Sequence, residues 1–211
     1  SNIKNQGKHQ TNPIVNSTED YLYIKNILKV SNNNSQTKNT ESMNSVQSHQ
    51  LALIEYTRGN LSKAKSILEK SYHGDKFNIY LASLMSDILW TMGEKKEARH
   101  ILQNILEVYP NNNAITFQLL RYNIKDSFKL VQSMERLNEI LENNKNNPVA
   151  YKLLAEGYEK TQEKYNSKLA LINFYNIKGN MPMAFRVIDD GLTSNEINQV
   201  QKKNLKSIKT A

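Results

Sequence analysis

The sequence repeats itself with a period of 34 residues. The segments LALIEYTRGNLSKAKSILEKS (51–71) and MSDILWTMGEKKEARHILQNI (85–105) align without a gap. The matched pairs, each 34 residues apart, are Gly59 with Gly93, Ala64 with Ala98, and Leu68 with Leu102. A third copy follows 35 residues after the second. In it, Ser133 corresponds to Ala98, Leu137 to Leu102 and Ile140 to Ile105. Such a period indicates a helix-turn-helix unit, which cannot bury its apolar faces alone and therefore stacks on copies of itself.

The repeated residues suit the parts of a helical hairpin. A glycine where the first helix ends permits the positive φ that a tight turn requires. The small residue lets the two helices approach closely, and the leucine fills the space between units. We expect the extra residue of the third copy to lie in the turn near Asp126 and Ser127. Pro110-Asn111-Asn112 and Asn146-Asn147-Pro148 separate successive units.

This pattern resembles the tetratricopeptide (TPR) family over about residues 45–193. The best match to the family's first helix is AYKLLAEGYEKT, which contains Tyr151, Leu154, Ala155 and Tyr158. Other first helices depart from the family pattern, since Glu55 stands where an aromatic residue is expected. The resemblance implies an all-α fold, namely an α-α superhelix of tetratricopeptide-like helix-turn-helix repeats.

The sequence divides into three parts. Residues 1–30 form an N-terminal connecting segment with a short helix at 21–30, whose apolar stripe is Leu22, Ile24, Ile27 and Leu28, with Val30 close by. Residues 31–44 are almost wholly polar and predict a linker or insertion. Residues 45–211 form the repeat array and its C-terminal capping helix. The first residues, Ser1-Asn2, look like the remnant of a cleaved tag, so we expect a fragment of a longer protein.

The end of the array is predicted in more detail. Helices are expected at 164–178 and 181–193, the second with Ala184 and Ile188 in the small and large positions. A final helix at 196–209 would close the solenoid with a polar face. Only half a repeat separates Gln162 from Gly179, so we expect an irregular junction after the helix at 149–163.

This ending resembles a more specific family. The order LLAEGYEKTQEK, then LALINFYNIKGNMPMAFRVIDDGL, then QVQKKNLKSIK is similar to the C-terminal repeat domain of the BepA-like periplasmic zinc metallopeptidase/chaperones. The segment Thr11-Asn12-Pro13-Ile14 would take the place of that family's His-Pro-Leu linker. The resemblance implies a periplasmic location, outer-membrane proteins or their assembly machinery as partners, and zinc only in an upstream peptidase domain.

Catalytic and cofactor signatures are missing from the sequence. There is no cysteine, no His-Glu-x-x-His zinc motif among the four histidines and no phosphate-binding glycine loop. The Gly-x-Ser-x-Gly motif of a serine nucleophile is also absent from the sequence. We therefore expect no enzyme activity and no cofactor in this chain. The net charge is +8, but only five of the 28 basic residues are arginine, which makes most of the specific nucleic-acid contacts. We expect no nucleic-acid partner and, with no apolar run near about 18 residues, no membrane span.

A binding groove is the remaining functional prediction. In tetratricopeptide arrays the first helix of each unit lines the concave surface, which here carries a mixture of aromatic and polar residues. The predicted partner-binding residues are His49, Leu53, Tyr56, Tyr80, Asp87, Trp90, Phe117 and Arg121, with Val46, Ser83 and Ile124 beside them. Each aromatic residue among them is as compatible with packing between helices as with a groove. Such a surface suits an extended polypeptide better than a small ligand.

The leading hypothesis is a protein-interaction domain, the non-catalytic part of a periplasmic metallopeptidase/chaperone for outer-membrane protein quality control and assembly. The first alternative is a free-standing repeat scaffold or co-chaperone, which would also be compatible with a cytoplasmic location. The second alternative is a secretion chaperone of the same fold.

Overall fold

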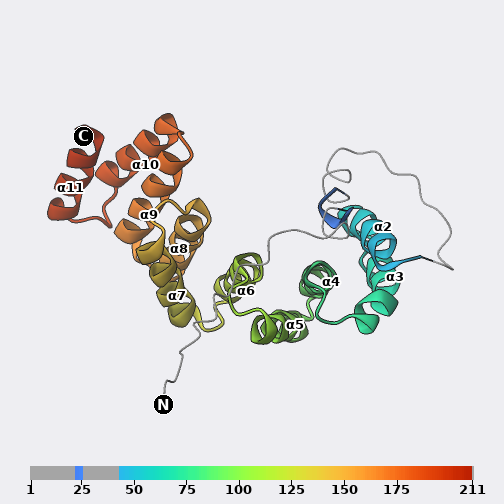
Figure 1. Cartoon of the computed structure of the whole chain (residues 1–211). Helices are drawn as coiled ribbons and strands as arrows, with labels where there is room; N and C mark the ends of the chain where they lie inside the picture. Colours follow the sequence, from blue (N-terminus) through green and yellow to red (C-terminus); the bar gives the residue numbers. More distant parts are fainter. Residues whose placement is uncertain (1–21, 26–42, 211) are drawn as a thin grey trace, which may run out of the picture. The chain divides into compact units, whose positions relative to one another are not determined.

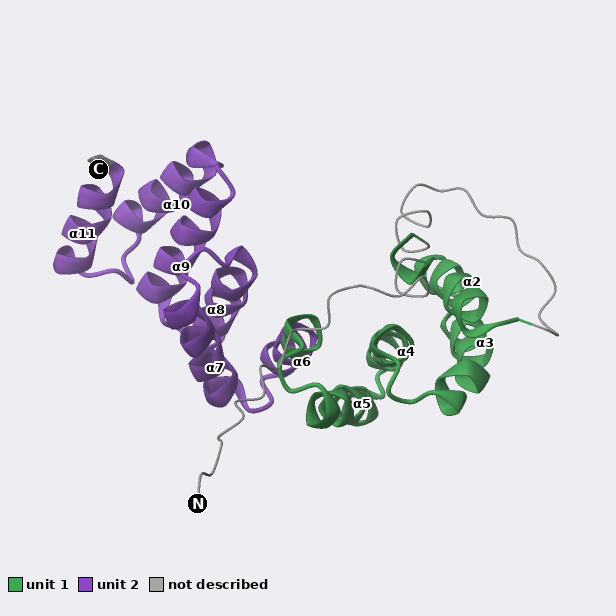
Figure 2. Cartoon of the chain, viewed as in Figure 1, with its two compact units in different colours: residues 1–116 green, residues 117–211 purple. Residues whose placement is uncertain are grey.

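The computed structural model describes residues 22–25 and 43–210, and every regular element in this part of the chain is a helix (Figure 1). The helices are α2 (Ser45–Thr57), α3 (Leu61–Gly74), α4 (Ile79–Met92), α5 (Lys95–Val108), α6 (Asn113–Lys125), α7 (Leu130–Asn143), α8 (Pro148–Lys160), α9 (Lys164–Ile177), α10 (Met181–Thr193) and α11 (Gln199–Thr210). The chain forms two compact units, residues 1–116 and 117–211, and the boundary falls within α6 (Figure 2). The predicted all-α fold class is confirmed.

One tight turn recurs in the described part of the chain. At its centre lies a residue with positive φ, at Gly59 (81°), Gly93 (91°), Ser127 (53°), Gln162 (62°) and Gly179 (68°). At Gly59, the backbone N–H donates to the carbonyl of Tyr56, and the next N–H, of Asn60, donates to Glu55. The same two hydrogen bonds are made at the other four turns. This pattern caps the carbonyls at the end of one helix and directs the chain into the next.

Two sequence predictions about these turns had different outcomes. The extra residue of the third repeat does lie near Asp126 and Ser127, where Lys129 adds a second positive φ of 46°. The irregular junction expected after α8 was wrong, because Gln162 makes the same turn as the glycines and α8 packs along α9. Unlike glycine, glutamine does not favour a positive φ, so its presence in the sequence does not indicate this turn.

The small residues of the repeat lie where two helices meet. Ala64, Ala98 and Ser133 are buried, and so are the leucines of the same repeats, Leu68, Leu102 and Leu137. The Oγ of Ser86 on α4 donates to the carbonyl oxygen of Ala98 on α5 at 2.9 Å. A larger residue at such a position would force the paired helices apart.

Asparagine begins the first helix of each repeat. The side chains of Asn44, Asn78, Asn112 and Asn147 each accept a hydrogen bond from a backbone N–H in the first turn of α2, α4, α6 and α8. Their spacing of 34, 34 and 35 residues is that of the repeat. Each cap satisfies a backbone donor that a helix start leaves open. Some of the 29 asparagines therefore have a definite structural role.

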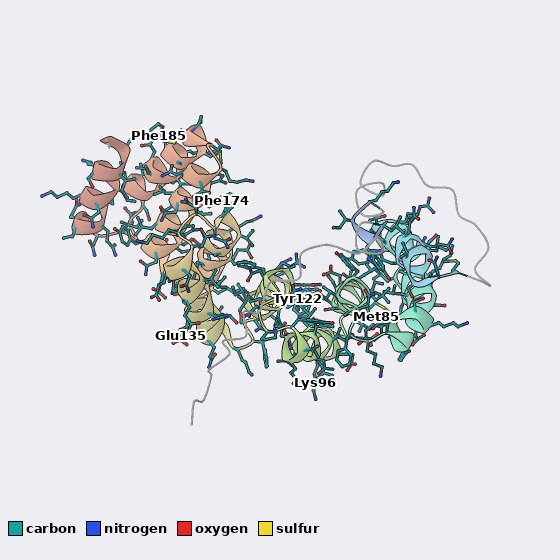
Figure 3. The ribbon with its side chains drawn as sticks, viewed as in Figure 1. Met85, Lys96, Tyr122, Glu135, Phe174 and Phe185 are labelled. Atoms are coloured by element: carbon teal, nitrogen blue, oxygen red, sulfur yellow. The ribbon has the colours of Figure 1, made fainter. Side chains whose placement is uncertain are left out.

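Unit 1 is built from two hairpins. α2 pairs with α3, α4 pairs with α5, and α4 also packs against both helices of the first hairpin. Met85 of α4 is buried within the unit, whereas Lys96 of α5 lies on its outer surface (Figure 3). The turn after α2 is fixed by the buried Glu55, whose carboxylate accepts from Asn60 Nδ2 at 2.8 Å and Lys63 Nζ at 3.1 Å. These hydrogen bonds hold the pKa of Glu55 below its usual value.

Unit 2 has two clusters of buried apolar side chains. The first joins α6, α7, α8 and Ala170 of α9, and the second joins α9, α10 and α11. Gly191 allows α11 to approach α10, since a Cβ at this position would overlap with Leu205 Cδ1. α11 covers the last hairpin as the expected capping helix, three residues later than the predicted start at 196.

The short N-terminal helix is described only at residues 22–25 (blue in Figure 1). The predicted apolar stripe is wrong at Leu22 and Ile24, which are 38% and 36% exposed. Tyr23 between them is fully buried. The other stripe residues, Ile27, Leu28 and Val30, lie outside the described residues, and so do residues 31–42 of the linker predicted at 31–44.

Candidate functional site

One stripe of α4 is left half-buried when its other faces pack. Tyr80, Ser83, Asp87 and Trp90 follow one another at intervals of three and four residues, while Leu81, Met85 and Ile88 are buried in the core. Residues with this spacing share one side of a helix. The structure thus places all four α4 residues of the predicted groove on a single surface.

The neighbouring helix α2 contributes Leu53 and Tyr56, which are also half-buried. The Tyr56 hydroxyl lies 3.2 Å from the hydroxyl of Thr91, which in turn donates to the carbonyl oxygen of Asp87 at 2.8 Å. These contacts join the ends of the two helices. We call the surface formed by Leu53, Tyr56, Tyr80, Asp87 and Trp90 the α2/α4 face.

Trp90 lies at the edge of the α2/α4 face that adjoins α5. Lys95 Nζ and the guanidinium carbon of Arg99 are 5.5 Å and 5.8 Å from the centre of a Trp90 ring. Cations at such distances are attracted to the π surface of an indole. The indole is therefore held by α5 while part of its surface remains open to solvent.

His49 differs from the prediction, because it is buried and cannot itself line an open groove. It is 3% exposed, and the Tyr23 ring meets it edge-on with the ring centroids 5.0 Å apart and the planes at 89°. Tyr23 also stacks on Tyr80, with centroids 4.7 Å apart and planes at 10°. Together, His49 and Tyr80 form the tyrosine cradle, one side from α2 and the other from α4.

Burial also changes the acid-base behaviour of His49. Removal from water lowers the pKa of its imidazole to about 4, from an ordinary value of 6.5, because the charged form loses its hydration. Nδ1 of His49 is buried and makes no hydrogen bond within the described part of the chain. The imidazole is neutral at pH 7 and acts as an aromatic packing partner.

The predicted groove residues of α6 belong to unit 2. Phe117 is half-buried and packs against the cluster that contains Leu120 and Met134. Arg121 is half-buried, with its guanidinium carbon 5.6 Å from the centre of the Tyr122 ring. Ile124 is fully buried, so its predicted place beside the groove is wrong. Phe117 thus has a packing role in unit 2.

Unit 2 has an open cleft that the sequence analysis did not predict. Its volume is about 600 Å³, and α7, α8 and α9 line it. Tyr151 and Tyr158 contribute aromatic surface, and Asn138 and Asn173 contribute amide groups. In the sequence the two tyrosines are identifiable only as repeat-motif residues. Asn138 lies on α7 and Asn173 on α9, so only the packing of these helices against α8 brings the amides beside the tyrosines.

The described residues hold neither a metal-binding cluster nor a membrane-spanning helix. Across residues 22–25 and 43–210, no three His, Asp or Glu side chains come together as ligands for a metal ion. Within the same residues, no helix combines the length and the apolar character needed to cross a bilayer. The side chains of the α2/α4 face include aromatic rings, a carboxylate and a hydroxyl-bearing tyrosine pair, which suit binding through contact and hydrogen bonding.

Comparison with solved structures shows the fold. A structure of MamA from residue 41 to the end, from Desulfovibrio magneticus RS-1, has a TM-score of 0.58 at 15% identity and covers 77% of this chain and 89% of its own. The RS-1 MamA ArsTM double mutant gives 0.54 at 14% identity, with 77% and 94% covered. MamA MSR-1 C2 gives 0.53 at 16% identity, with 79% and 98% covered. The chain therefore has a tetratricopeptide-type repeat fold.

Sequence comparison adds no family. No protein-family model matches the chain, and no curated protein matches it. The resemblance to the BepA-like metallopeptidase/chaperones stays a prediction.

Proposed function

We propose that this chain is a non-catalytic protein-interaction scaffold that binds a polypeptide partner on the α2/α4 face. The observation that carries the proposal is the row of half-buried aromatic side chains, Tyr56, Tyr80 and Trp90, on two adjacent helices. Tyrosine and tryptophan offer large contact areas at low cost in side-chain entropy, and they dominate many protein interfaces. The repeat fold supports the proposal because stacked helical hairpins present extended surfaces.

The chemistry of the face favours a polypeptide. Aromatic rings would accept apolar or aromatic side chains, while the Tyr56 hydroxyl and the Asp87 carboxylate offer hydrogen-bonding groups between them. These groups extend over about three turns of α4, from Tyr80 to Trp90, and about one turn of α2, from Leu53 to Tyr56. A ligand that contacts all of them must itself be extended, as a peptide strand or a helix is.

The experiment uses a peptide selected from a displayed library on the full chain, with its affinity measured by isothermal titration. Tyr56→Ala and Trp90→Ala should each weaken binding about tenfold or more, as central aromatic residues of an interface do. Tyr109→Ala is the matched control, because Tyr109 is 37% exposed and lies outside the face.

Circular dichroism separates a binding defect from unfolding. Both variants should keep the helix content of the native chain, since neither side chain is fully buried. If Tyr56→Ala and Trp90→Ala lose helicity together with binding, these residues belong to the core and the groove assignment is wrong. If binding is unchanged in both, the partner binds elsewhere.

A finer version of the proposal places the scaffold in a periplasmic metallopeptidase/chaperone that handles outer-membrane proteins. The C-terminal part of the chain, which forms α8 to α11, resembles the repeat domain of that family, and this resemblance supports the finer version. Any zinc would then be bound by an upstream peptidase domain. The gene sequence upstream of Ile3 tests this version, which requires a signal peptide and a His-Glu-x-x-His motif there. Without them, a free-standing scaffold or co-chaperone, in the periplasm or the cytoplasm, is the better description.

A further inference from the structure

The tyrosine cradle is occupied by the chain's own N-terminal segment. Tyr23 is fully buried, although its neighbours Leu22 and Ile24 are exposed. A single side chain of residues 22–25 is thus inserted while the residues on either side stay at the surface. This is how an anchor residue of a bound peptide is placed, with one aromatic ring in a pocket formed by its receptor.

The cradle belongs to the same surface as the α2/α4 face. His49 precedes Tyr56 by seven residues on α2, and Tyr80 precedes Asp87 by seven on α4. A separation of seven residues, about two helical turns, keeps both members of each pair on one side of their helix. His49 thus lies on the side of α2 that carries Tyr56, and the ring of Tyr23 lies against it.

The segment is tethered to the helices that it contacts. Seventeen residues, 26–42, separate Lys25 from Met43, which precedes α2. A ligand joined by a tether of this length is present at an effective concentration on the order of millimolar. Even a weak intrinsic affinity of Tyr23 for the cradle then keeps the site filled.

We propose that the tyrosine cradle is a peptide-binding site for an aromatic anchor residue, and that residues 22–25 are its intramolecular ligand. A partner that inserts an aromatic side chain between His49 and Tyr80 must displace Tyr23. The partner segment resembles YLYIK, in which the anchor has apolar neighbours and a following basic residue. This inference rests on the proposed function and specifies its ligand and its regulation.

The test measures binding of a fluorescein-labelled peptide of residues 18–30, TEDYLYIKNILKV, by fluorescence anisotropy. The full chain carrying Tyr23→Ala should bind it at least about tenfold more tightly than the native chain, because the tethered competitor is gone. Leu22→Ala is the matched control on the same segment. It should bind the peptide as weakly as the native chain, since Leu22 is exposed.

Two further variants locate the binding. A peptide in which the residue equivalent to Tyr23 is alanine should not bind the Tyr23→Ala chain. Adding Tyr80→Ala to that chain should abolish the gain, because the ring on which Tyr23 stacks is removed. Equal affinity of the native and Tyr23→Ala chains, or binding of the alanine peptide, would overturn the proposal.

A measurement on the unmodified chain guards against a folding defect in Tyr23→Ala. Nitration by tetranitromethane, followed by mass spectrometry, should be at least about tenfold slower at Tyr23 than at the exposed Tyr109, and excess peptide should speed it. Nitration of both tyrosines at one rate would overturn the assignment.

Occupation by a second copy of the chain is the competing arrangement. Light scattering at two concentrations should find the native chain and Tyr23→Ala equally monomeric. A native dimer that Tyr23→Ala dissociates would overturn the intramolecular assignment.

The failure of this inference can be distinguished from the failure of the proposed function. If Tyr56→Ala weakens binding of the selected peptide but Tyr23→Ala changes nothing, only this inference fails. If Tyr56→Ala leaves the affinity for the selected peptide unchanged, the proposed function fails.

Discussion

The ring of Tyr23 lies parallel to the ring of Tyr80, with their centroids 4.7 Å apart. Tyr23 comes from a segment that precedes the repeats, and Tyr80 begins the half-buried stripe of α4. The stack therefore joins the only described residues before Met43 to the surface that we propose for a partner. Aromatic pairs of this kind contribute about 0.5–1.5 kcal/mol beyond the area that they bury.

Stability should fall on acidification through His49. The pKa of His49 is lowered to about 4 in the folded chain, so between pH 6.5 and 4 the unfolded chain binds more protons. The free energy of unfolding should therefore decrease as pH falls through this window, by at most about 3 kcal/mol, and this contribution should level off below pH 4. Urea unfolding at several pH values measures it.

His49→Gln is the control for this pH dependence. Glu55, whose pKa is also lowered, contributes stability that is lost at lower pH, below its ordinary value of 4.5. The variant's stability should thus depend less on pH than that of the native chain between pH 6.5 and 4, and the two curves should run parallel below pH 4. Parallel curves across the whole range would show that His49 does not titrate in this way.

Gly59→Ala and Gly93→Ala should each destabilise the chain by about 1–2 kcal/mol. Both glycines have a positive φ, 81° and 91°, that an alanine adopts only with strain, although nothing lies near enough to clash with its Cβ. Gly74→Ala is the matched control, at the end of α3 in open space and without a positive φ. Its midpoint of thermal unfolding should stay level or rise slightly, and equal losses in all three variants would argue against the turn strain.

Asn147→Ala should cost about 1 kcal/mol, because the Oδ1 of Asn147 accepts from the backbone N–H of Ala150 at the start of α8. Asn146→Ala tests the neighbouring asparagine, whose side chain caps no helix. Urea midpoints of the two variants should differ, with Asn146→Ala close to the native chain. If both behave alike, the asparagine period is not a capping period.

Gly157→Ala should destabilise unit 2 by about 1–3 kcal/mol, since its Cβ would lie 2.9 Å from both Cγ and Sδ of Met134. In a Met134→Ala background the same change should cost much less, because the flexible side chain that it meets has been removed. The four unfolding free energies form a double-mutant cycle. Additive losses would contradict the close approach of α7 and α8.

Much of the fold could be predicted because the repeat positions are restricted by packing and backbone conformation. Ala64, Ala98 and Ser133 must be small, and Gly59 and Gly93 must turn, so their period gives the hairpins. The turn at Gln162 could not be predicted, because its backbone conformation is imposed by the helices on either side. The capping asparagines share the repeat period, but asparagine is so frequent in this chain that their period does not stand out in the sequence.

The candidate site was predicted less well, for a physical reason. Helical spacing places His49, Tyr56, Tyr80 and Asp87 on exposed stripes, and only a contact distant in sequence decides which of them is covered. Tyr23 provides that contact. Its segment is too short for periodicity to show which side chain is inserted, so the apolar pattern predicts burial of Leu22 and Ile24 instead.

The most direct test of the central claim maps a selected peptide ligand onto the full chain by NMR chemical-shift changes. We expect the largest changes at Leu53, Tyr56, Asp87 and Trp90 of the α2/α4 face, with a further change at Tyr23 as it leaves the cradle. Changes confined to the unit 2 cleft around Tyr151 and Tyr158 would contradict the account, because the partner would then bind a different surface.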